Sequence, residues 1–96
     1  MAAKLRLLAN PDRLVMLCKL GLEEQSVNEL VQLTGIAQST VSQHLAVLRD
    51  AGVVARRRQA QSLYYRLVDG HIFAMIEALC LICQAGEHPI ASQRVV

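Results

Sequence analysis

The chain has 96 residues with a formal net charge of +2, and 53% of its residues are hydrophobic while only 3% are aromatic. This length suits one domain with its own core, and the aliphatic excess predicts apolar surface for a partner subunit to cover. A signal segment and a bilayer-spanning run of about 20 apolar residues are both missing, so we expect a cytoplasmic protein with no membrane partner.

The first element with clear boundary signals is a helix that should run from Pro11 to about Leu20, because Asn10 is a good cap, Pro is tolerated in a first helical turn, and Gly21 follows as a stop.

Two further helices joined by a glycine turn predict a helix-turn-helix. Ser26 to Glu29 has the spacing of a capping box, and Thr34-Gly35 ends the helix that it opens. Gln38 opens the next helix, which Ala51-Gly52 closes. The second helix of the pair has one apolar stripe that should be buried, made of Val41, Leu45 and Leu48.

The hydrophobic period changes after Gly52. Leu63, Tyr65 and Leu67 alternate with Tyr64 and Arg66, which predicts two antiparallel strands that meet around Gln59 to Gln61. This turn contains no Gly or Asn, so we expect a loose wing rather than a tight hairpin.

A last helix is expected from about His71 to Ala85, with Gly86 as its end. Its only charge between Ile72 and Cys83 is Glu77, so it should be buried on two sides, with a second subunit as the second cover. The predicted fold is mainly α with a small β-hairpin wing. Residues 1–86 would form a winged helix-turn-helix DNA-binding and dimerisation domain, and residues 87–96 a flexible tail.

The polar head of the predicted recognition helix points to DNA. From Ile36 to Val68 there are five arginines against one aspartate, a local charge of +4, while the rest of the chain carries −2. Short hydrogen-bonding side chains suit a helix that enters a major groove, and arginines on the strands suit the flanking backbone. The alternative is an ordinary solvated helix face. The candidate DNA contacts are Gln38, Ser39, Thr40, Ser42, Gln43, His44, Arg56, Arg57 and Arg58.

Three segments together resemble the ArsR/SmtB family of winged-helix repressors: "LANPDRLVMLCKL", "SVNELVQLTGIAQSTVSQHLAVLRDAGVV" and "RRQAQSLYYRL". The resemblance covers about residues 5–83. It implies a homodimer formed by the first and last helices, which binds an inverted repeat in double-stranded DNA and releases it when an inducer binds. The sequence departs from the family pattern in two ways: Ala37 replaces the serine before the recognition helix, and the first helix is shortened to about Ala2–Ala9.

The family's metal sites are incomplete in this sequence. The family's arsenic-type cysteine pattern aligns with Ser26-Val27-Asn28, which contains no cysteine. Asp69-Gly70-His71 matches the opening of the zinc-type site, but Ile82 and Ala85 occupy the remaining ligand positions, so Asp69 is expected to be a helix cap. We therefore predict no bound cofactor and no zinc.

The closer resemblance is to the BigR/SqrR branch, whose members sense persulfides and oxidants with two cysteines. Cys18 matches one position, and the partner would be Cys83, one residue away from the branch's usual place, or the additional Cys80. Three alternatives stay open: a dithiol switch, a three-thiolate site for As(III) or another soft metal, and inert cysteines packed in the core.

The predicted function is that of a DNA-binding transcriptional repressor that releases its operator when Cys18 becomes linked to a cysteine of the last helix. A constitutive regulator without an inducer and a protein-interaction module that never binds DNA are the other candidates. An enzyme is disfavoured, because paired carboxylates, a Ser/His/Asp arrangement and a phosphate-binding loop are not found in the sequence.

Overall fold

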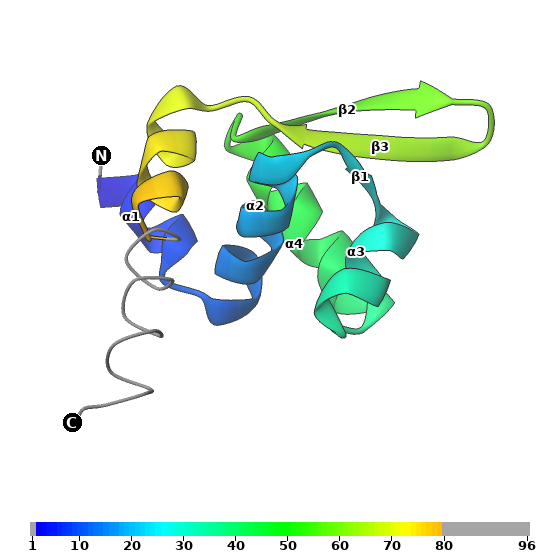
Figure 1. Cartoon of the computed structure of the whole chain (residues 1–96), viewed down its shortest axis with the longest axis horizontal. Helices are drawn as coiled ribbons and strands as arrows, with labels where there is room; N and C mark the ends of the chain where they lie inside the picture. The colour runs from blue at the N-terminus through cyan, green and yellow to red at the C-terminus, as the bar shows by residue number, and fades with distance from the viewer. Residues whose placement is uncertain (1, 80–96) are drawn as a thin grey trace.

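The computed structural model describes residues 2–79, which form a helical body with a projecting hairpin (Figure 1). The helices are α1 (Ala2–Leu8), α2 (Pro11–Leu22), α3 (Val27–Thr34) and α4 (Gln38–Asp50), and the strands are β1 (Gln25–Ser26), β2 (Val54–Gln59) and β3 (Ser62–Leu67). Residues 70–79 are again helical up to the last described residue. Within residues 2–79, no helix has the length and hydropathy to cross a membrane. Cys80, Cys83 and the predicted tail lie outside the described residues.

Helix α2 begins as predicted but continues past its expected end. The Asn10 Oδ1 accepts hydrogen bonds from the backbone N–H groups of Asp12 and Arg13 at 2.9 and 3.1 Å. The prediction that Gly21 stops the helix was wrong, because α2 runs to Leu22. A methyl group built at Gly21 would lie 3.7 to 3.9 Å from Leu67, Phe73 and Ile76. Tertiary packing at this point therefore outweighs the low helix propensity of glycine.

The helix-turn-helix is confirmed in detail. Ser26 Oγ accepts from the Glu29 N–H at 3.1 Å, and Glu29 Oε1 accepts from the Ser26 N–H at 2.8 Å, which completes the capping box. Gly35 ends α3 with a φ of 75°, in the left-handed region that glycine adopts without strain. Helix α4 has the predicted bounds.

The wing is a tighter and better supported structure than the sequence indicates. β2 and β3 pair from Val54↔Leu67 to Gln59↔Ser62, so only Ala60 and Gln61 form the turn, and Ala60 adopts a φ of 56°. The expected loose turn was wrong: pairing of the two strands up to Gln59↔Ser62 holds Ala60 in a conformation that non-glycine residues seldom adopt. The short strand β1, which was not predicted, adds to β3 and gives the strand order β1-β3-β2.

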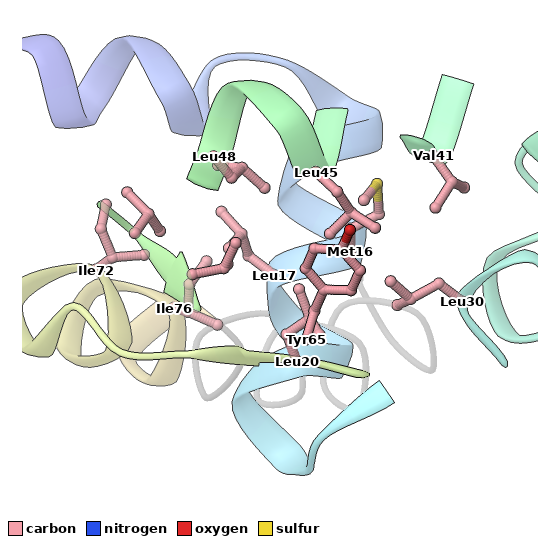
Figure 2. Packing of buried hydrophobic residues seen from close by; sticks show 12 residues of the cluster. Met16, Leu17, Leu20, Leu30, Val41, Leu45, Leu48, Tyr65, Ile72 and Ile76 are labelled. Carbon is pink, nitrogen blue, oxygen red and sulfur yellow. The ribbon is translucent and has the colours of Figure 1, made fainter. Parts of the chain in front are cut away.

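The core is aliphatic and joins every helix of the helix-turn-helix to the sheet. Figure 2 shows its side chains converging between α2, α4, β3 and the helix at 70–79. Tyr65 provides the one buried ring among the described residues. The buried hydrophobic residues are Met16, Leu17, Leu20, Leu30, Val41, Leu45, Leu48, Val53, Val54, Tyr65, Ile72 and Ile76.

An ion pair connects α1 to the start of the helix at 70–79. Asp69 caps that helix, as predicted, by accepting from the Ile72 N–H at 3.0 Å. Its carboxylate also lies 2.9 Å from Lys4 Nζ, which donates a further hydrogen bond to His71 Nδ1 at 3.1 Å. The Ile72 N–H and the Lys4 ammonium both lower the pKa of Asp69 below its usual value, because both bind the charged form.

We predict that Asp69→Ala lowers the free energy of unfolding by about 0.5–2 kcal/mol, the usual loss for a helix cap. Urea denaturation of the wild type and the variant, at the same protein concentration, measures this difference in the free energy of unfolding. Glu77→Ala, an exposed change on the same helix, is the control and should stay within about 0.5 kcal/mol of the wild type.

The lowered pKa of Asp69 also gives a pH dependence with a defined sign. Its contribution is complete above the unfolded-state pKa of about 4 and is lost as the pH falls through the lower folded-state pKa. The Asp69→Asn variant should therefore lose less stability than the wild type below about pH 4. Equal acid profiles of the two proteins would contradict this assignment.

Candidate DNA-binding surface

The outward face of α4 is polar over its first two turns. Its stripe of Val41, Leu45 and Leu48 is buried against the core, and this fixes which side chains point outward. Thr40 and His44 are partly buried on the flanks of the stripe. The exposed hydrogen-bonding side chains are Gln38, Ser39, Ser42 and Gln43.

The first turn of α4 has no side-chain cap. Ala37 occupies the cap position with φ −59° and ψ 145°, and its methyl group offers no acceptor. The first helical hydrogen bond runs from the Val41 N–H to the Ala37 carbonyl at 2.9 Å. The earlier N–H groups of this turn are therefore not capped by Ala37, and an unsatisfied helix start of this kind favours anionic groups.

Residues from the first turns of α3 and α4 and from the outer part of the hairpin line one notch with a volume of about 240 Å³. Hydroxyl and amide side chains dominate its walls. It is lined by Ser26, Val27, Asn28, Gln38, Gln61, Ser62 and Leu63.

The wing arginines lie on two different faces of the sheet. Arg56 pairs with Tyr65 and Arg58 with Leu63, so these two arginines share the sheet face that carries the core residues. Both are nonetheless exposed, since the hairpin extends past the helices (Figure 1). Arg57 pairs with Tyr64 and lies on the opposite face, together with Arg66.

Arg57 is engaged within the molecule. Its Nε lies 2.9 Å from Glu24 Oε2, its Nη2 lies 2.7 Å from Glu24 Oε1, and its Nη1 donates to Gln59 Oε1 at 2.7 Å. Its guanidinium carbon lies 5.2 Å from the centre of the Tyr64 ring. The Arg57 hydrogen bonds lower the pKa of Glu24, and the same bonds raise the pKa of Arg57. Sequence reasoning named Arg57 as a backbone contact and missed Glu24 altogether.

Only one of the three cysteines lies in the described part of the chain. Cys18 is partly buried on α2, where it packs against the core. Across residues 2–79 there is no group of three or more His, Cys, Asp or Glu side chains able to hold a metal ion.

An apolar surface lies between α1 and the helix at 70–79. Leu5 and Leu79 are 53% and 38% exposed and lie together on this surface, and a contiguous apolar patch of this kind is typical of an interaction site. A groove of about 360 Å³ runs along this surface. It is lined by Leu5, Leu8, Ala9, Met75, Ala78 and Leu79.

Residues 10–56 match the family described as bacterial regulatory proteins of the arsR family. A biofilm growth-associated repressor of Agrobacterium fabrum is 45% identical over 86 residues, which cover 90% of this chain and 74% of the relative. The chain belongs to the ArsR family. It is thus a regulatory protein rather than an enzyme, as the sequence predicts.

Further relatives agree in sequence and in structure. The transcriptional activator HlyU of Vibrio cholerae is 45% identical over 84 residues, covering 86% of this chain and 78% of HlyU. The crystal structure of the transcriptional repressor BigR from Xylella fastidiosa superimposes with a TM-score of 0.80 at 42% identity, over 84% of this chain and 83% of BigR. The predicted winged-helix fold and the resemblance to BigR are confirmed.

We predict that Ala37→Ser, which supplies the missing cap of α4, raises the free energy of unfolding by about 0.5–2 kcal/mol. The backbone at Ala37 is already extended, as a capping residue requires. The matched control is Ala46→Ser, the same change at an exposed position inside α4, which should instead lower stability by about 0.5 kcal/mol. Urea denaturation measures the free energy of unfolding of both variants. An equal change in the two would show that the missing cap at Ala37 does not reduce the stability of α4.

Proposed function

We propose that this ArsR-family protein is a homodimeric transcriptional repressor that binds an inverted-repeat operator through α4 and the wing. One observation carries the proposal. Gln38 of the exposed polar face of α4 lines the same notch as the outer part of a hairpin that displays exposed arginines, and one buried core packs both α4 and the base of the hairpin.

Each group of side chains has a separate task in this proposal. Gln38, Ser39, Ser42 and Gln43 read base edges in the major groove, where a glutamine amide can form two hydrogen bonds with adenine. Thr40 and His44, on the flanks of the helix, contact phosphates. Arg56 and Arg58 hold the flanking backbone or minor groove.

A second copy of the chain would cover the apolar surface between α1 and the helix at 70–79. Leu5 and Leu79 are the exposed anchors for that contact. A two-fold axis there would place two copies of α4 against two half-sites about one helical turn of DNA apart. The proposal also places the protein in the cytoplasm, where its thiols stay reduced until a signal arrives.

We predict that Gln43→Ala reduces the preference for the operator over random duplex DNA by about 1–3 kcal/mol, because a base contact is lost. Fluorescence anisotropy with a duplex selected by the wild-type protein from a random pool measures both affinities. Gln32→Ala on α3 is the matched control, since Gln32 is also exposed but lies outside this surface. An equal loss of affinity for the selected duplex and for random duplex DNA would show that Gln43 does not read a base.

The inducing signal in this proposal acts on Cys18 and a cysteine of the last helix. An oxidant such as peroxide would take two electrons and two protons from the thiols of Cys18 and Cys80 or Cys83, leaving a disulfide and water. Two glutathione persulfide molecules would instead leave a trisulfide link: one supplies the inserted sulfur, the second takes up the two electrons, and two glutathione molecules and one hydrogen sulfide are released. A Cβ added at Gly21, about one turn after Cys18 on α2, would lie 3.9 Å from Phe73 and Ile76, so this turn of α2 runs beside the helix at 70–79. A link would therefore strain an existing helix contact and change the spacing of the two α4 helices.

We predict that Cys18→Ser binds the selected duplex as tightly as the wild type but no longer releases it after treatment with peroxide or glutathione persulfide. Anisotropy before and after treatment measures release, and peptide mapping identifies the linked cysteine. Release from oxidised Cys18→Ser would refute the switch.

Arsenite under reducing conditions tests the competing soft-metal site. Arsenite bound to all three thiols, with release of DNA, would favour that alternative. Three unmodified thiols with constant DNA affinity would instead make the protein a constitutive regulator.

A further inference from the structure

The ion pair between Glu24 and Arg57 spans the sheet of the wing. Arg57 lies on β2 and Glu24 directly precedes β1, while β3 lies between these two strands. Tyr64 of β3 pairs with Arg57 on one side and with Ser26 on the other. The Arg57 side chain therefore passes over the Tyr64 ring and reaches the carboxylate on the far side of the central strand.

This contact lies at the place where the wing leaves the body. β1 pairs with β3 only through Gln25↔Tyr65 and Ser26↔Tyr64. Beyond that row, β2 and β3 have only each other as paired strands, and Arg56 to Ser62 are all exposed. A two-stranded ribbon of this kind has little stability of its own. The contact with Glu24 therefore anchors the last row in which three strands are joined.

The geometry of the pair fixes orientation as well as charge. Two guanidinium nitrogens bind the two carboxylate oxygens, and the third binds Gln59. A bidentate pair of this kind restricts the angle between its two side chains, which a single point contact does not. The lowered pKa of Glu24 keeps its carboxylate charged throughout the neutral range.

The same contacts remove Arg57 from the set of free cations. A phosphate would have to displace the Glu24 carboxylate from both Nε and Nη2. Arg56 and Arg58 lie on the other sheet face and form no ion pair with a carboxylate within residues 2–79. Arg57, whose charge is engaged by Glu24, therefore lies between Arg56 and Arg58 on the same strand, β2.

We propose that Arg57 is a positioning residue of the wing, which acts through Glu24 to hold the hairpin at its angle to α4 and makes no phosphate contact itself. This inference rests on the proposed DNA-binding function, which it deepens. Of the three consecutive arginines, Arg56 and Arg58 bind phosphate, and Arg57 sets their position.

The test compares Glu24→Gln, Arg57→Gln and the exchanged pair Glu24→Arg with Arg57→Glu. Affinity for the duplex selected by the wild-type protein is measured by anisotropy from low to high salt. Each single variant should weaken binding by about fivefold to tenfold, the lower range of coupling between sites, with an unchanged salt slope. The exchanged pair should recover most of the affinity, because its total side-chain reach and its opposite charges are kept.

Matched controls come from neighbouring positions. Glu23→Gln, the exposed carboxylate next to Glu24, should leave binding unchanged. Arg58→Gln should lower the salt slope by about 0.9, the value for one lost phosphate contact. Urea denaturation of each variant reports whether the fold is intact, and amide exchange of β2 and β3 should rise in both single variants without DNA present.

Several results would overturn the inference. A salt slope reduced by about 0.9 in Arg57→Gln, with unchanged binding by Glu24→Gln, would make Arg57 a phosphate contact. An exchanged pair weaker than Arg57→Gln would lead to the same conclusion. Absence of salt-dependent duplex binding by the wild type would instead refute the proposed function, so the two failures are distinguishable.

Discussion

The packing of the α4 stripe on α2 is the constraint on which the rest of this molecule depends. Leu45 and Leu48 belong to the same buried cluster as Met16 and Leu17, and Figure 2 shows them facing one another across the core. Burial of each such side chain stabilises the fold by about 1.5–3 kcal/mol. This contact sets the rotation of α4 about its axis. Because one face of the helix is buried, the polar residues of the opposite face point to solvent.

The elements that could be predicted from the sequence are those whose causes are local. Asn10, Ser26, Glu29 and Asp69 each satisfy backbone groups within three residues, so their spacing predicts the start of a helix. The stripe of α4 follows equally from the helical period. The exposed polar positions of the candidate surface were predicted for the same reason.

The features that escaped prediction depend on residues far apart in the chain. Gly21 stays helical where α2 runs beside β3 and the helix at 70–79, and β1 exists because β3 offers an edge. Strand pairing closes the turn at Ala60 although no glycine is present. The contact of Glu24 with Arg57 spans 33 positions of sequence, and nothing in a run of arginines distinguishes its middle member.

The junction between α2 and β1 is a place where insertions and deletions in the chain are restricted. α2 ends at Leu22 and the sheet begins at Gln25, with Glu24 between them. Side chains alternate between the faces of a strand, so one inserted residue before Gln25 would turn the Glu24 carboxylate away from Arg57. Surface connections usually tolerate insertions and deletions. This one is held to a single length by a salt bridge, and the same short stretch of chain joins the wing to the helix that carries Cys18.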